Sequence, residues 1–143
     1  MRANIDSALL QAWDSGGFGL PYRVADLPLM EPVTHTVLSG PGGNPWARVS
    51  VLPARPSVAS MGTSGDDRID GVMQVDLFYP LGQGQGAANT KADDIAAVFG
   101  AGKTHSYNGV NVHCDYCGRI SQLVTEDWLQ TIVEVGFHSW IQR

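Results

Sequence analysis

Segments in which apolar and polar residues alternate constrain the fold of this chain more than any other feature. The first is IDGVMQVDLFYP, residues 69–80, and the second is WLQTIVEVGFHSWI, residues 128–141. A shorter segment, WARVSVLP at residues 46–53, alternates in the same way. Because side chains two residues apart lie on the same face of a strand, each segment predicts a strand with one buried face. In the last segment, the shared face carries Leu129, Thr131, Val133, Val135, Phe137 and Ile141.

Two amphipathic segments are typical of helices that pack against such a sheet. Between Ile5 and Trp13, apolar side chains recur every four residues and form one stripe. In the second segment, Gly100 and Gly102 end a periodic run, as glycines commonly end helices. The apolar face of that run consists of Ala88, Ala92, Ile95 and Phe99.

The order of these segments predicts the fold class. The predicted elements follow one another in the order helix, strand, long loop, strand, helix, strand and strand. Connections of the hairpin type favour a mostly antiparallel sheet flanked by two helices, which is an α+β fold. The strands at 46–53 and 69–80 are expected to form a long hairpin across the aperiodic and mobile loop Ala54–Arg68. We expect a single domain over residues 1–143.

Two further stretches complete this prediction. Asn108-Gly109 predicts a turn, and the strand after it is expected to place Val110, Val112, Cys114 and Tyr116 on one face. The stretch 18–45 is irregular and contains five prolines, with a short strand expected at Val33–Leu38. Its role is left open.

The composition excludes several classes of protein. Hydrophobic residues make up 43% of the 143 residues, charged residues 16%, and the net charge is −5. A protein that binds nucleic acid through its phosphates is normally basic, so specific nucleic-acid binding is not expected. The sequence has no apolar run of about 18 residues that would cross a membrane. The N-terminal MRANIDSALLQAW does not resemble a signal peptide, so we expect a cytosolic protein with free thiols.

The glycine-rich stretch YPLGQGQGAA raises the question of phosphate binding. Gly82, Gly84 and Gly86 are spaced Gly-x-Gly-x-Gly, whereas a dinucleotide fingerprint requires Gly-x-Gly-x-x-Gly in a βαβ unit. The stretch also lacks the Lys-Ser/Thr ending of a P-loop, and Pro80 precedes it. We therefore expect a corner between strand and helix, and no bound cofactor.

Other motifs for chemistry are weak. HCDYC could begin a metal site or a redox pair, but structural zinc needs four ligands, and the sequence has no second cysteine pair. Cys114 is expected in the core, and Cys117 as a thiol at a strand end facing the other way. The sequence has no Gly-x-Ser-x-Gly elbow, and its carboxylate pairs are adjacent residues that diverge on a strand or helix. No catalytic or metal-ligating residue is therefore predicted.

Two tryptophans indicate that the second face of the last strand is also covered. Trp128 and Trp140 lie on its more polar face, together with Ile132. The cover is expected from within the domain, with another subunit as the alternative.

The segment from Trp46 to Phe99 resembles a family of small phage and prophage proteins, the tail terminators of long-tailed phages. Its most specific stretch is VDLFYPLGQGQGAA, and the C-terminal strands resemble the family more loosely. The resemblance implies a structural subunit with no catalytic residues and no cofactor. It implies a homohexameric ring that caps the tail tube, stops its growth and offers a surface to the head.

This resemblance sets the expected partners and location. The partners are other copies of the chain, the tail tube protein and a head-completion or connector protein, with DNA passing through the lumen. The expected location is the tail–neck junction of the virion, after assembly in the bacterial cytoplasm. We expect contacts at Arg55, Met61, Arg68 and Gly84. The alternatives are another neck, head–tail joining or tail-completion protein, and a small metal- or nucleotide-binding enzyme.

Overall fold

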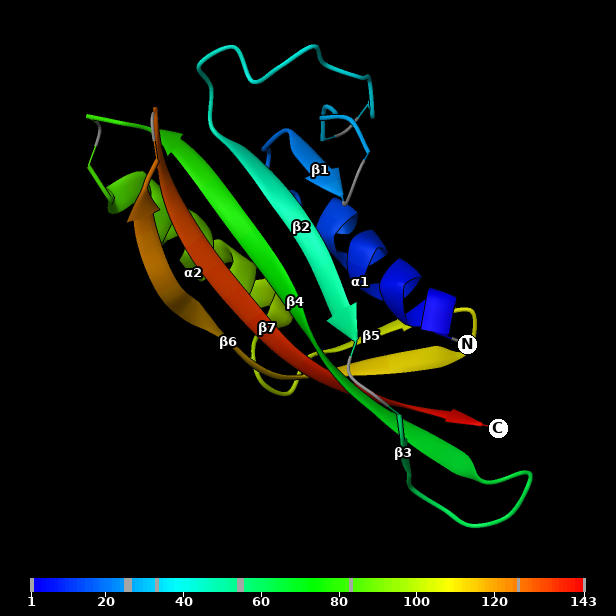
Figure 1. Cartoon of the computed structure of the whole chain (residues 1–143). Helices are drawn as coiled ribbons and strands as arrows, with labels where there is room; N and C mark the ends of the chain where they lie inside the picture. The colour runs from blue at the N-terminus through cyan, green and yellow to red at the C-terminus, as the bar shows by residue number, and fades with distance from the viewer. Residues whose placement is uncertain are drawn as a thin grey trace.

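The two longest alternating segments form neighbouring strands in a computed structural model of the chain (Figure 1). β4 (Asp66–Pro80) and β7 (Trp128–Gln142) pair antiparallel over their full lengths, from Asp66↔Gln142 to Pro80↔Trp128. The structure describes residues 2–24, 27–32, 34–53, 56–82, 84–125 and 127–142. Its other strands are β1 (Tyr22–Val24), β2 (Trp46–Pro53), β3 (Ser57–Val58), β5 (Thr104–Tyr107) and β6 (Val110–Val124).

The sheet is mostly antiparallel, with the order β1-β2-β4-β7-β6-β5, and β3 pairs with the beginning of β4. Among the pairs between described strands, only β1 and β2 run parallel. The predicted hairpin of β2 and β4 is confirmed. Asn108 and Gly109 both have positive φ, at 51° and 85°, as a tight turn between β5 and β6 requires.

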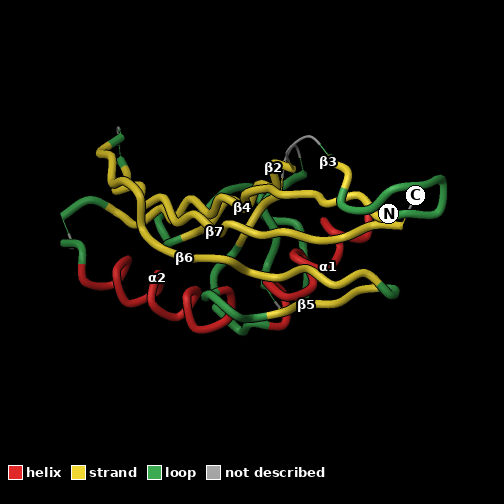
Figure 2. Tube along the Cα trace, turned by 90° about the horizontal axis from the view of Figure 1, so that it is seen from below, coloured by secondary structure: helices red, strands yellow, loops and turns green. Residues whose placement is uncertain are grey.

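Both helices cover the same face of the sheet (Figure 2). α1 (Arg2–Ser15) packs on β5 and β6, and α2 (Gly86–Phe99) packs on β4, β6 and β7. The predicted stripes of both helices lie in one hydrophobic core with the inward-facing residues of the strands. The α+β prediction is therefore confirmed. The largest fully buried side chains are Phe99, Phe137, Ile5, Leu9, Met73, Leu77 and Ile95.

The proline-rich stretch differs from the prediction. The described part of the expected strand Val33–Leu38, residues 34–38, is not a strand: Val37 makes only an isolated bridge to Met30, and His35 has a φ of 57°. β1, a strand of three residues that pairs with β2, is not predicted by the sequence. Such a short strand contains too little alternation to be recognised, and its position depends on pairing with β2.

β6 also departs from simple alternation. Its pairing with β7 shifts between Cys114 and Tyr116, where Asp115 forms an irregularity of the bulge type. Cys114 and Cys117 consequently both face the core, whereas Tyr116 lies on the opposite face over Gly136. The predictions that Tyr116 shares a face with Cys114, and that Cys117 ends a strand facing the other way, are wrong.

Candidate interaction site

The face of the sheet opposite the helices, here the outer face, is covered by no helix of the described structure (Figure 2). At one end of it, Trp46 stacks on Phe78 with ring centroids 4.2 Å apart, and Trp128 meets Trp46 edge-on at 6.3 Å. These aromatic side chains shield one another, so Phe78 is buried without a covering element. The predicted internal cover is therefore partly replaced by neighbouring side chains of the same face.

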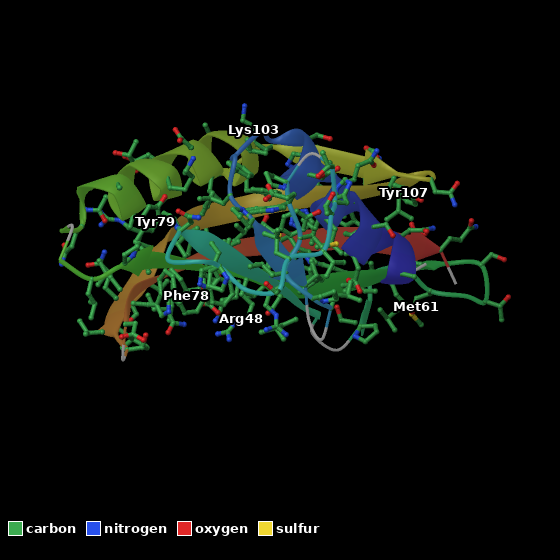
Figure 3. The ribbon with its side chains drawn as sticks, turned by 90° about the horizontal axis from the view of Figure 1, so that it is seen from above. Arg48, Met61, Phe78, Tyr79, Lys103 and Tyr107 are labelled. Atoms are coloured by element: carbon green, nitrogen blue, oxygen red, sulfur yellow. The ribbon has the colours of Figure 1, made fainter. Side chains whose placement is uncertain are left out.

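An ion pair lies next to this aromatic cluster. Arg48 donates from Nε and Nη2 to Oδ2 of Asp76, at 3.0 and 2.7 Å, and Gln74 donates to Oδ1 at 3.0 Å. The Asp76 side chain is only 2% exposed, whereas that of Arg48 is 42% exposed. Figure 3 shows Arg48 and Phe78 together on the side of the sheet away from α2. The buried carboxylate of Asp76 therefore has one partner on β2 and one on its own strand, β4.

The other end of the outer face is also aromatic, but more exposed. Trp140 is 45% exposed, which contradicts the expected burial within the domain. The rings of His113 and His138 stack at 5.1 Å, and the Arg68 guanidinium lies 5.6 Å from the centre of the Trp140 ring. A large aromatic side chain that is this open is typical of a protein contact surface.

Beyond this end, part of the sheet projects past the helices (Figures 1 and 2). We call this part the arm; it comprises β3, the loop 59–65, residues 66–70 of β4 and residues 138–142 of β7. Its loop is held by the backbone of Asp66, whose carbonyl accepts from the amides of Ala59 and Ser60 and whose amide donates to Ser60 Oγ at 2.7 Å. The segment predicted as a mobile loop is thus partly strand, because Ser57–Val58 forms β3 and residues 66–68 belong to β4.

The four predicted contact residues lie in different places. Met61 lies in the loop of the arm and is 89% exposed (Figure 3). Arg68 lies in the arm on β4 and binds the carboxylate of Asp70 at 3.0 Å. Gly84 lies outside the arm, in the exposed turn before α2, with a φ of 75°. Arg55 falls outside the described residues. The arm therefore brings two of the four together, and their role as contacts stays a prediction.

The glycine corner does not have the surroundings of a dinucleotide site. The strand after α2 is β5, which is separated from β4 by β7 and β6. Successive antiparallel pairings make β4 and β5 run in opposite directions, so this is not a βαβ unit. A Cβ at Gly82, Gly84 or Gly86 would meet open space. These glycines therefore serve the turn, where Gly82 and Gly84 have positive φ.

The side chain of Cys114 is buried, and that of Cys117 is half-buried against the same core. Burial raises the pKa of Cys114 to about 11, with smaller contributions from the charges of Cys117 and Asp115. Burial also raises the pKa of Cys117 to about 11. Reactive cysteines have a lowered pKa and partial exposure, so these two thiols have the properties of core residues. Within the described ranges, no three His, Cys, Asp or Glu side chains come together as metal ligands would.

We expect both thiols of the folded protein to resist modification by iodoacetamide near pH 8 and to react rapidly in denaturant. The fold holds their protons more tightly than the unfolded chain does. The raised pKa values of the two thiols therefore stabilise the folded state. This stabilisation is complete below the ordinary thiol pKa of 9.0 and is lost as the pH rises toward 11. Mass spectrometry of the alkylated protein measures the labelling. Rapid labelling of both thiols in the folded protein at pH 8 would contradict this assignment.

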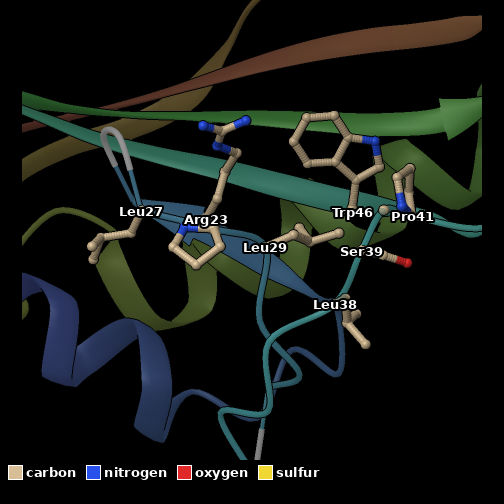
Figure 4. A pocket seen from close by; sticks show the side chains of 9 residues that line it. Arg23, Leu27, Leu29, Leu38, Ser39, Pro41 and Trp46 are labelled. Atoms are coloured by element: carbon tan, nitrogen blue, oxygen red, sulfur yellow. The ribbon is translucent and has the colours of Figure 1, made fainter.

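The structure has a pocket that no sequence pattern predicts. It lies at the β1 edge, where Arg23 of β1 and Trp46 of β2 stand on the same side of the sheet (Figure 4). We call it the edge pocket. Its remaining walls come from the proline-rich stretch, which has no periodicity that could have predicted a pocket.

In the described part of the chain, no helix is long and apolar enough to span a lipid bilayer.

Comparisons with known proteins identify a family. A family model described as phage tail terminator protein matches residues 9–137, which is most of the chain. A solved structure of another protein superposes with a TM-score of 0.67 at 20% sequence identity. The alignment covers 96% of this chain and 92% of the other, and at this identity it supports the fold alone. The search of curated proteins gave no match.

Proposed function

Because the chain belongs to the phage tail terminator family, we propose that it forms a hexameric ring that caps the tail tube, stops polymerisation of the tube and presents the surface that joins the head. Proteins of this family are structural components of the phage tail rather than enzymes. The family match over residues 9–137 is the observation that carries the proposal. The proposed partners are further copies of the chain, the tube protein and a head-completion protein at the tail–neck junction.

Two separate surfaces support ring formation. A ring of identical subunits joined head to tail needs two different patches on each subunit. The arm offers one patch, with Met61 at its end, and the aromatic part of the outer face around Trp46 offers another. Neither surface is covered by another described element of the chain, so both are open to contacts between proteins (Figure 3).

The charge of the chain supports the passage of DNA. A net charge of −5 gives no general attraction for phosphates. DNA would therefore slide through a ring of such subunits without adhering. A strongly basic lumen in an experimental structure of the ring would contradict this part of the proposal.

The proposal is tested by electron microscopy of particles from a phage that lacks the gene for this chain. We expect tails longer than those of the wild type and without heads, because nothing would stop tube growth or prepare the tube for joining. Restoring the gene in trans should restore the normal tail length, which controls for effects on neighbouring genes.

Two other results have clear meanings. Tails of normal length that fail to join heads would contradict tube termination and indicate a connector. Normal infectious particles would contradict a structural role in the tail altogether.

A further inference from the structure

The edge pocket has a volume of about 460 Å³ and opens on the same side as the outer face. Its walls are mostly apolar and include Leu27, Leu29, Leu38 and Pro41. One water molecule occupies about 30 Å³ of liquid, so the pocket has room for a large side chain with adjoining backbone. Arg23 is the one charged residue among those described that line it.

Two hydrogen-bond donors of this pocket have no acceptor within the described part of the chain. Nε of Arg23 and Nε1 of Trp46 are shielded from solvent, and neither has a hydrogen-bond partner among the described residues. Buried N–H groups are almost always paired, because leaving one without an acceptor is costly. The pocket is suited to an apolar side chain, and an oxygen acceptor of the same occupant reaches these two N–H groups only when the side chains of Arg23 and Trp46 shift.

The loop of the arm has these properties. Met61 is 89% exposed, the highest value among the large hydrophobic residues that the structure describes. Its side chain is unbranched and flexible, so it adapts to irregular apolar cavities. The loop around it, SMGTSG, consists of small residues whose backbone carbonyls can approach a partner closely. Residues 57–70 contain three aspartates and one arginine, a net charge of −2, which complements Arg23.

The arm cannot reach the edge pocket of its own chain. Arg68 belongs to the arm, whereas Phe78 lies beside Trp46 at the pocket. Arg68 and Phe78 are ten positions apart on β4, a distance of roughly 33 Å at about 3.3 Å per residue. The arm and the pocket thus lie at opposite ends of the sheet (Figure 1).

We infer that the Met61 loop of one copy inserts into the edge pocket of a second copy. Met61 fills the apolar part of the pocket, and the side chains of Arg23 and Trp46 shift on insertion so that backbone carbonyls of the loop accept from them. Because the two surfaces differ, the contact is head to tail, and its repetition closes a ring when the rotation allows. This inference rests on the proposed ring and specifies the contact that holds it together.

The first test compares the oligomeric mass of four proteins by native mass spectrometry: wild type, Met61→Asp, Thr63→Asp and Gly40→Trp. Thr63→Asp is the matched control, since it adds the same charge to the same exposed loop and keeps Met61. Gly40 lines the pocket, and a side chain there begins in open space, so Gly40→Trp obstructs the pocket without a clash at Cβ.

We expect Met61→Asp and Gly40→Trp each to weaken the association of subunits by about tenfold or more, the factor that corresponds to about 1.4 kcal/mol. Thr63→Asp should stay within about twofold of the wild type. Circular dichroism checks that each variant is folded. Rings of folded Met61→Asp protein with unchanged stability would overturn the inference.

The second test joins the two surfaces covalently. The pair Met61→Cys and Ser39→Cys, on the arm and the pocket, should form disulfides between subunits and give a ladder of linked chains without reductant. Either substitution alone should give no ladder, because Cys114 and Cys117 face the core. If the wild type does not assemble in solution, the same pair is introduced into the phage and examined in purified tails.

These outcomes separate the inference from the proposed function. Rings without cross-links overturn the insertion of Met61 and leave the ring itself in place. Absence of cross-links both in solution and in tails also overturns the insertion. The tail lengths of the gene-deletion phage decide the terminator function independently of either result.

Discussion

Phe99→Ala is expected to lower the free energy of unfolding by about 3–5 kcal/mol, the usual cost of removing a buried phenylalanine ring. Phe99 is fully buried at the end of α2. Its ring stacks on Phe18 with centroids 6.5 Å apart and lies 5.1 Å from the ring of His105. The substitution would therefore open a cavity where α2, β5 and the segment after α1 meet. Since a domain is stable by only about 5–15 kcal/mol, this is a large fraction of the total.

Urea denaturation followed by far-UV circular dichroism measures this loss. Asp93→Ala is the matched control, because Asp93 is an exposed residue of the same helix. It should change the stability by less than about 0.5 kcal/mol. A Phe99→Ala protein as stable as Asp93→Ala would show that α2 does not pack as described.

Arg48→Ala is expected to have the second largest effect, a loss of about 2–3 kcal/mol, because it leaves a buried carboxylate with fewer partners. Asp76 is shielded from solvent and would retain only the hydrogen bond from Gln74. The loss is smaller than for a fully buried pair, since Arg48 is partly exposed and water can replace its guanidinium. Urea denaturation again gives the value.

A double substitution distinguishes the buried charge from lost packing. Arg48→Met with Asp76→Leu removes both charges and keeps similar volumes, and it should recover most of the stability lost in Arg48→Ala. A double variant that is less stable than Arg48→Ala would mean that the ion pair itself stabilises the fold. The expectation that the double variant is more stable than Arg48→Ala would then be wrong.

Residues that repeat regularly could be predicted from the sequence, and residues placed by irregular backbone could not. The stripe that ends at Phe99 and the alternation that ends at Ile141 identified α2 and the core face of β7. Tyr116 was assigned to the wrong face because one extra residue, Asp115, interrupts the alternation, and nothing in the local sequence marks that position. The sequence predicts the start of β4 at Ile69 rather than at Asp66, because residues 66–68 are polar and show no alternation.

The candidate contact surfaces were predictable only in part. An aperiodic loop between two strands pointed to Met61 as an exposed residue, and the structure places it there. The edge pocket depends on a parallel pairing of β1 with β2 and on loops without periodicity. The pairing of Arg48 with Asp76, 28 positions apart in the sequence, depends on the register between β2 and β4. A sequence pattern predicts which residues of a strand or helix share a face. It does not predict which residues of two neighbouring strands are paired.

The position of β7 has a consequence for how the protein is made. This strand comes last in the sequence, yet it lies between β4 and β6 in the sheet. Before the ribosome has released it, β1, β2 and β4 form one piece and β5 with β6 another, and neither has a complete hydrophobic core. Strand pairs whose members lie this far apart in the sequence form slowly. The nascent chain therefore exposes two unpaired strand edges until synthesis is finished, and its exposure to aggregation is concentrated in that interval.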